Sequence, residues 1–353
     1  MAGIRALERS DLPQVSTLFA QVMGGASAER VAPYLRRILL DDPWADPEIP
    51  PLVHEGPDGG IVGFIAASTR RMVLDGRKVR MAVSSNLVAH PDWRSKGVGA
   101  LLNRKLLGGP QEFTVADRAN DESRGLWLGL GGQELPGASI AWFRVLSPGA
   151  TADALVSRRS GRLARAARLV ARPVDALGGR LVPPPPRPSG STEPLTAETL
   201  AEQVAAAGRR LRLRPDYDPA YLEWVLAELR RLDRGELHAQ LVRNAQGRVL
   251  GWFIHLLPPG GVAEVLQVGV TGTDPEPVLD HLVAHAAAHG AAAVQGRLEP
   301  VSAGMIGRPG VLVRKNARAL VHAEANVLGL LSSTTSLCSH LEGEWLVSHA
   351  ARQ

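Results

Sequence analysis

The segment from Ser84 to Leu107 constrains the fold most strongly, because it has the pattern of a strand, a sharp turn and a glycine-rich entry into a helix. His90-Pro91-Asp92 ends the strand, since proline has no N–H to donate to a ladder. Gly97 and Gly99 leave backbone N–H groups uncovered at the start of the helix, where the helix dipole adds partial positive charge. Such a nest binds phosphate or diphosphate. The segment therefore predicts an α/β domain with an anion site at a strand–helix junction.

The spacing Arg94-x-x-Gly97-x-Gly99, after a strand and before a helix, resembles the acyl-coenzyme A pyrophosphate loop of the GNAT acetyltransferase superfamily. The resemblance implies that acetyl-CoA or another acyl-CoA is a substrate. A glycine-capped turn in an ordinary α/β domain is the alternative. The expected acyl-CoA-binding residues are Leu87, Val88, Ala89, Arg94, Ser95, Lys96, Gly97, Val98, Gly99 and Ala100.

Composition narrows the class of protein. A chain of 353 residues is too long for one typical domain, so two are expected. No apolar run approaches the ~20 residues of a membrane span, and the N-terminus does not have the pattern of a signal peptide. Cys338 is the only cysteine, which excludes an intrachain disulfide and fits a reducing compartment. We therefore expect a cytoplasmic protein. Its net charge of +5 suits an anionic ligand without indicating nucleic acid.

The order of elements in the first half matches the GNAT fold across residues 1 to about 148. Apolar spacing, capping residues and turn dipeptides predict helices at 10–23, 28–40 and 121–130, and strands at 50–55, 61–68, 78–89, 112–116 and 138–146. The last of these strands is expected to close the first sheet.

Residues 149–195 have a different character. Arg158, Arg162, Arg165 and Arg172 recur at helical spacing opposite apolar residues, which predicts a basic amphipathic helix. Its arginines are either solvated on a helix packed against the domain, or they bind an anionic partner such as phosphate, acidic lipid or RNA. Residues 183–186 are four prolines and predict a stiff, extended linker.

The pattern of the first half then recurs. The segment 218–226 parallels 31–38, and 241–254 parallels 52–65 with one residue of slack. Helices are expected at 195–211 and 277–289, strands at 262–270 and 291–298, and a strand at 318–327 that closes the second sheet. The counterpart of the glycine loop, residues 271–277, lacks the arginine and the second glycine and carries two acidic residues. We therefore expect this half to have lost CoA binding.

The predicted fold class is α/β (α+β), with two GNAT-like domains that each contain a mixed, mostly antiparallel sheet flanked by helices. The expected boundaries are 1–148 for the N-terminal domain, 149–195 for the basic helix and proline-rich linker, and 196–353 for the degenerate C-terminal domain.

The resemblance implies a mechanism in which an amine attacks the thioester directly. A backbone N–H within 87–89 polarises the carbonyl, a carboxylate removes the amine proton, and a tyrosine protonates the thiolate. The sequence departs from this pattern, because the strand 81–90 has no carboxylate and Trp127 stands at the tyrosine position. The remaining catalytic candidates are Asn120, Glu122, Ser123 and Glu264, and the expected substrate pocket comprises Asn86, Trp127 and Trp142.

Three histidines recur every fourth residue, at His281, His285 and His289. Adjacent pairs have the spacing of metal ligands, but the first and third lie roughly 12 Å apart along a helix axis and cannot share one ion. No local carboxylate or cysteine completes a set. We therefore expect a solvated helix face and no metal.

Three functions remain open. The first is an acyl-CoA-dependent N-acyltransferase that acts on a small-molecule or peptide amine, with hydroxyl acceptors not excluded. The second is a non-catalytic acyl-CoA sensor, which Trp127 and the missing carboxylate favour. The third is a Fem-like transferase that uses aminoacyl-tRNA, favoured by the arginines of the basic helix and by an isoelectric point of about 9.8. Nucleic acid is expected as a partner only under this last alternative.

Overall fold

The computed structural model describes residues 3–24, 27–157, 182–232, 234–344 and 346. The chain forms two compact units, each assembled from separate stretches of sequence. The first contains Met1–Pro136, Leu211–Trp224 and Ala317–Gln353, and the second contains Gly137–Arg210 and Val225–Asn316. We refer to them as unit 1 and unit 2.

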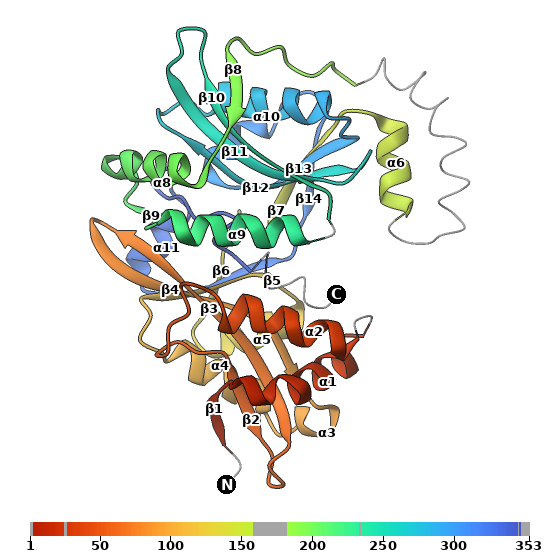
Figure 1. Cartoon of the computed structure of the whole chain (residues 1–353), viewed down its shortest axis with the longest axis vertical. Coiled ribbons are helices and arrows are strands. Elements are labelled where there is room, and N and C mark those ends of the chain that lie inside the picture. The colour runs from red at the N-terminus through yellow and green to blue at the C-terminus, as the bar shows by residue number, and fades with distance from the viewer. Residues whose placement is uncertain (1–2, 25–26, 158–181, 233, 345, 347–353) are drawn as a thin grey trace. The chain divides into compact units, whose positions relative to one another are not determined.

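Unit 1 is built on a mixed sheet with the strand order β1-β2-β3-β4-β5-β15-β6, and β9 pairs with β3 (Figure 1). Only β4 and β5 run parallel, and the other neighbouring strands of this sheet are antiparallel. The strands are β1 (Ile4–Ala6), β2 (Leu52–Glu55), β3 (Ile61–Leu74), β4 (Arg77–Ala89), β5 (Phe113–Ala119), β6 (Gln133–Glu134), β9 (Leu213–Pro215) and β15 (Arg318–His322).

The helices of unit 1 pack around this sheet. Helix α1 lies against β3 and β4, and α4 lies against β2, β3 and β4. The helical segments are η1 (Arg9–Asp11), α1 (Leu12–Met23), α2 (Ala28–Leu35), η2 (Arg36–Leu40), α3 (Pro91–Arg94), α4 (Val98–Leu107), α5 (Asp121–Gly129) and α11 (Ala325–Leu331).

The long hairpin of β3 and β4 forms the centre of unit 1. Its turn is Asp75-Gly76, with φ of 49° and 82°, and this dipeptide suits the left-handed backbone of a two-residue hairpin loop. Strand β3 is buried over nearly its whole length and β4 over its middle, so buried residues run continuously there and do not alternate with exposed ones. The strands predicted at 61–68 and 78–89 thus form one hairpin, in which β3 is longer than expected.

Unit 2 contains a second sheet with the strand order β14-β7-β13-β12-β11-β10-β8. Helix α10 (Glu276–Ala288) packs on β11, β12 and β13, and its apolar side chains join one core with theirs. The strands are β7 (Ile140–Val145), β8 (Ser191–Pro194), β10 (Glu236–Arg243), β11 (Val249–Leu257), β12 (Val262–Val270), β13 (Ala293–Arg297) and β14 (Val311–Lys315).

The other helical segments of unit 2 are α6 (Pro148–Ser157), α8 (Ala197–Ala206), η3 (Ala207–Arg209) and η4 (Pro300–Met305), and α9 (Pro219–Arg231) contains residues of both units. No helix in the described ranges is both long enough and apolar enough to cross a bilayer. The basic helix predicted at 158–172 lies outside the described residues.

Two strands lie in different sheets from those predicted. The strand expected to close the first sheet, β7, pairs with β13 and β14 in the second. The strand expected to close the second sheet, β15, pairs with β5 and β6 in the first. Strand β7 forms where the sequence predicts it, and β15 begins at the predicted residue but ends at His322, before α11. The main error therefore concerns the partner strands. The predicted fold class, two mixed and mostly antiparallel sheets flanked by helices, is confirmed.

Candidate active site

A bulge in β4 sets the geometry of the site. Ser85 pairs with Ala66 and Val88 pairs with Phe64, so two residues of β4 oppose one residue of β3. Asn86 occupies this bulge with φ of 49°, a left-handed conformation that asparagine adopts more readily than most residues. The bulge bends β4 at the point where the resemblance places the carbonyl-polarising amide.

Strands β4 and β5 separate just before the bulge. Their parallel pairing ends at Val83 and Val115, so the β5-facing side of β4 beyond Val83 has no ladder partner. A cavity of about 300 Å³ lies in this opening. Its lining includes Ser84–Leu87 of β4, Arg118 and Ala119 of β5, and Asn120, Ser123 and Trp127. The cavity thus has backbone amides on one wall and an indole on another.

The glycine loop leads into α4 at the end of the bulged strand. Gly97 is the N-cap residue of α4 with φ of 75°, and no side chain caps the helix. Within the described residues, no acceptor is found for the backbone N–H groups of Val98, Gly99 and Ala100. First-turn amides without an acceptor, together with the helix dipole, are features that favour the binding of an anion.

The residues that precede α4 are exposed, and the helix packs closely on β3. Arg94, Ser95 and Lys96 are exposed, and the Lys96 ammonium lies 3.7 Å from the centre of the Trp93 ring. Gly63 of β3 permits the close approach of α4, because a Cβ atom there would come within 2.4 Å of Val98. The remaining predicted acyl-CoA-binding residues also lie here: Leu87 lines the cavity, and Val88 and Ala89 pair with β3.

A carboxylate reaches the cavity from the far end of the sequence. Glu344 lines the cavity and is only 5% exposed. Its side chain accepts a hydrogen bond from the backbone N–H of Arg118, on the strand that faces the bulge. Just beyond it, the carbonyl of Leu346 accepts a hydrogen bond from the Tyr34 hydroxyl. Both ends of this short segment are therefore held within unit 1.

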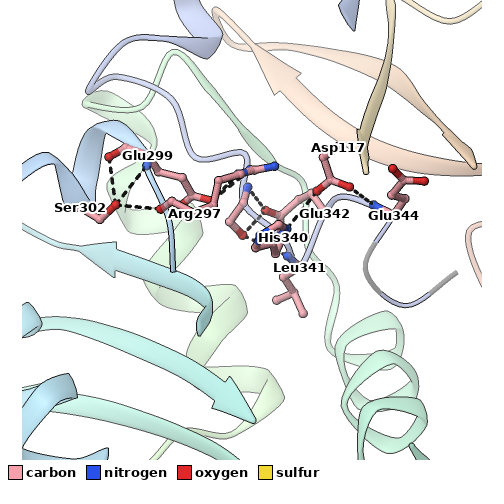
Figure 2. Close-up of polar contacts among 9 residues, drawn as sticks. Asp117, Arg297, Glu299, Ser302, His340, Leu341, Glu342 and Glu344 are labelled. Carbon is pink, nitrogen blue, oxygen red and sulfur yellow. Dashed lines mark hydrogen bonds and ion pairs between the residues drawn. The ribbon is translucent and has the colours of Figure 1, made fainter. Parts of the chain in front are cut away.

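Asp117 of β5 anchors the same segment (Figure 2). Its carboxylate lies 3.1 Å from Nδ1 of His340 and accepts a hydrogen bond of 3.2 Å from the backbone N–H of Glu344. Gly343 makes this approach possible, because a Cβ atom there would come within 2.2 Å of an Asp117 oxygen. Glu342 accepts hydrogen bonds of 2.7 Å from the backbone and hydroxyl of Ser339, which fixes the turn.

The environment of Glu344 makes it a stronger base than an ordinary glutamate. Burial, and then the negative charge of Asp117, raise the pKa of Glu344 well above its usual value. The Arg118 amide opposes these effects by stabilising the carboxylate. A carboxylate whose pKa moves toward neutrality suits general base catalysis.

The other predicted catalytic residues have different surroundings. Asn120 caps α5 by accepting a hydrogen bond of 2.8 Å from the Ser123 backbone, and both residues line the cavity. Glu122 is exposed and does not line it. Glu264 lies on β12 in unit 2. Among these four, only Asn120 and Ser123 border the cavity of unit 1.

The predicted pocket residues are likewise divided. Asn86 and Trp127 line the cavity, and Trp127 is buried. Trp142 lies instead in the core of unit 2 on β7, where Gly296 of β13 leaves room for its indole. Because β7 belongs to the second sheet, Trp142 does not line this cavity.

Sequence reasoning missed Glu344 and Asp117. Asp117 follows directly after the predicted strand 112–116, and β5 extends through it. Glu342-Gly343-Glu344 is flanked by Leu341, Trp345 and Leu346, and acidic residues within such an apolar stretch were the available signal. That signal indicates burial, but it does not indicate which strand the segment contacts.

Comparisons with known proteins agree with this geometry at the level of the fold. No model of a known protein family matches the chain, and no curated protein matches it. Solved structures do match. A probable N-acyltransferase from Enterococcus faecalis V583 is 8% identical with a TM-score of 0.60, over 92% of this chain and 73% of that one. A GCN5-related N-acetyltransferase from Anabaena variabilis is 14% identical with a TM-score of 0.58, over 91% of this chain and 72% of that one.

The N-myristoyltransferase of Saccharomyces cerevisiae, solved with bound myristoyl-CoA, is 10% identical with a TM-score of 0.51, over 91% of this chain and 82% of that one. At these identities the similarity concerns the fold alone. The chain has the two-sheet architecture of GNAT-type acyltransferases over about nine-tenths of its length.

Proposed function

We propose that this chain, which has a GNAT-type fold, is an acyl-CoA-dependent N-acyltransferase that transfers an acetyl or other acyl group to an amine of a small molecule or peptide. One observation carries the proposal: the bulge at Asn86 and the buried carboxylate of Glu344 line one cavity in the opening between β4 and β5. The uncapped first turn of α4 lies next to it, since a Cβ atom on Gly99 would be 3.5 Å from the cavity-lining Leu87. These features supply an anion site, a set of amides and a base in one unit.

The glycine loop holds the diphosphate of the substrate. The amides of Val98, Gly99 and Ala100 donate to phosphate oxygens, and the exposed Arg94 and Lys96 add positive charge beside them. The pantetheine arm then runs into the opening between β4 and β5, where β4 has no ladder partner. The acyl group enters the cavity bordered by Trp127.

The reaction proceeds by direct attack. The amine nitrogen forms a bond to the thioester carbon while a backbone amide of the bulge, within 87–89, stabilises the developing oxyanion. Glu344 removes the proton that the amine must lose. The carbon–sulfur bond breaks and the thiolate takes a proton from water, because the indole of Trp127 cannot supply one near neutral pH.

The test adds one negative charge to the anion site. Gly99→Asp places a carboxylate beside the first-turn amides without a steric clash, since the nearest atom to a new Cβ is 3.5 Å away on Leu87. We expect this variant to bind CoA at least ~10-fold more weakly in isothermal titration, through repulsion and competition for the amides. Gly272→Asp is the matched control, because it adds the same charge in open space in unit 2. Equal CoA affinity in all three proteins would refute the loop as the binding site.

A second function is favoured by Trp127, which offers no acidic proton to a leaving thiolate. Under this alternative the chain binds acyl-CoA and does not turn it over. Release of free CoA thiol in the presence of amine and hydroxyl acceptors distinguishes the two functions. Titratable binding of acyl-CoA without release under any acceptor would support a sensor.

The aminoacyl-tRNA alternative loses support from the loop, because that donor has no use for a diphosphate site at α4. The arginines that favoured it lie outside the described residues. Salt-dependent retention of tRNA on the protein, together with no measurable CoA binding, would restore this alternative.

A further inference from the structure

Four histidines from three elements gather in unit 2. His238 lies on β10, His255 on β11, and His285 and His289 lie at the C-terminal end of α10. The first two are directly opposite each other in the β10–β11 ladder, with ring centres 4.8 Å apart. The rings of His285 and His289 stack at 4.0 Å, and His289 lies 4.7 Å from His238. The acyltransferase mechanism uses none of these side chains.

This arrangement corrects the expectation of a solvated histidine face on α10. His281 is buried and lies within hydrogen-bond distance of the Ser189 carbonyl, at 3.1 Å, so it takes no part in the cluster. His285 is half-buried. The histidine that joins His285 and His289 is His238, which comes from β10. The spacing of histidines along α10 alone therefore does not reveal the cluster.

The free nitrogen atoms point to a metal. One ring nitrogen from each of His238, His285 and His289 lies within 4.8 Å of the other two. Nε2 of His238 is buried and has no hydrogen-bond partner in the described structure. An unsatisfied buried nitrogen is costly unless something binds it. Each nitrogen bound to a zinc ion lies ~2.0–2.1 Å from it, so the three nitrogens would move closer together when an ion binds.

Neighbouring groups orient the ligands as metal sites require. Nδ1 of His289 lies 2.8 Å from the carbonyl of His285 and can only donate to it, which leaves the Nε2 lone pair of His289 available. Nδ1 of His285 lies 3.3 Å from Nε2 of His255. When His285 donates in this contact, its own Nε2 lone pair is available as well. His255 is then a supporting residue and not a ligand.

An acidic side chain lies beside the three histidines. An imidazole offers a lone pair to a cation only in its neutral form, and a negative charge nearby favours the cation. The carboxylate of Glu236 lies 3.8 Å from Nε2 of His238 and adds negative charge on the exposed side of the cluster.

We infer that His238, His285 and His289 form a binding site for a zinc-class divalent cation, which ties α10 to β10 in unit 2. Three imidazoles with an open fourth position, filled by water or by Glu236, are a ligand set that zinc accepts. The ion replaces the unmet hydrogen bond of His238 and joins the end of the helix to the sheet.

The test uses the full-length chain without an affinity tag and Zn²⁺ in a non-chelating buffer. Wild-type protein is expected to bind one Zn²⁺ per chain in isothermal titration, and to unfold at a higher temperature when Zn²⁺ is present. His289→Ala is expected to weaken Zn²⁺ binding at least ~100-fold and to abolish the thermal shift. His289 is exposed, so this variant removes a ligand without disturbing the core.

His238→Ala should give the same loss, with a folded circular dichroism spectrum as its control. His322→Ala removes a histidine of β15 in unit 1 and is expected to bind Zn²⁺ as the wild type does. The proposal is overturned if the wild type shows no saturable Zn²⁺ binding, or if His289→Ala and His238→Ala both bind it with unchanged affinity.

Discussion

At the scale of single residues, the proposed function depends most on Glu344. Glu344→Gln keeps the size and the Arg118 contact of the side chain but removes the base. We expect kcat for acyl transfer to fall by ~10²–10⁴-fold, the usual contribution of a general base, with CoA affinity unchanged. Glu122→Gln, an exposed glutamate outside the cavity, is the matched control and should keep full activity. Unchanged kcat in the Glu344 variant would remove it from the mechanism.

The raised pKa of Glu344 also fixes the direction of a pH effect. Its active form is the carboxylate, so activity should rise with pH through a value above the ordinary 4.5, and Glu344→Gln should lose this rise. A raised folded-state pKa means that the neutral form stabilises the fold below 4.5, and that this contribution is lost as pH increases through the folded-state value. The glutamine variant should therefore become more stable relative to wild type at alkaline pH, which urea unfolding at several pH values measures.

The residues of the site differ in how far the sequence alone could identify them. Gly97 and Gly99 are local signals, because their spacing and the strand before them are read from adjacent positions. Glu344 lies 227 positions after Asp117 in the sequence, and its backbone N–H donates a hydrogen bond to the Asp117 carboxylate. A contact of that sequence separation depends on how the whole sheet is assembled, and no periodicity in the chain encodes it.

At the scale of elements, the bulge in β4 is the feature that opens the site. Asn86 holds φ of 49°, which a β-branched residue tolerates poorly. We expect Asn86→Val to lower the free energy of unfolding by ~1–3 kcal/mol, the usual cost of such strain. Asn86→Gly, which adopts this conformation freely, should lose less. Denaturant titration of both variants measures the difference, and a valine variant more stable than the glycine variant would mean that β4 has no such bulge in solution.

Helices and strands were largely predictable because their signals are local. The Asp75-Gly76 turn, the capped start of α5 and the apolar run of β12 each specify an element within a few residues. The bulge was not predictable, since it depends on the register between β3 and β4 and not on composition. The same limit applies to the histidine cluster, in which α10 supplies a visible pattern and β10 supplies a single residue.

At the scale of the whole molecule, the exchange of β7 and β15 is the main departure from the sequence-based prediction. Both strands follow the expected order of elements, and a simple repeat predicts that each pairs within its own half. Strand pairing is chosen by tertiary contacts, which a repeat in sequence does not record. Each sheet therefore needs a strand from the other half of the chain.

This topology predicts that a fragment of residues 1–148 does not fold alone. The fragment lacks β15. It also lacks four buried side chains that pack against β3, β4 and β5 in the core of unit 1: Leu213, Val321, Val327 and Leu330. At about 1.5–3 kcal/mol for each, their loss approaches the whole stability of a typical domain, about 5–15 kcal/mol. We expect the fragment to show no cooperative unfolding transition in urea.

The matched experiment expresses residues 1–148 and 149–353 together as two chains. The cut falls between β7 and β8, so it divides no strand, and every strand of both sheets is still present. Because β15 on the second chain completes the first sheet, and β7 on the first chain completes the second, the two chains should copurify and unfold together near the midpoint of the intact protein. A fragment 1–148 that unfolds cooperatively alone and does not retain its partner would show that β7 and β15 are dispensable to the other sheet. The strand exchange would then be wrong, and Glu344 would lose its connection to β5, since the segment that carries it follows β15 in the chain.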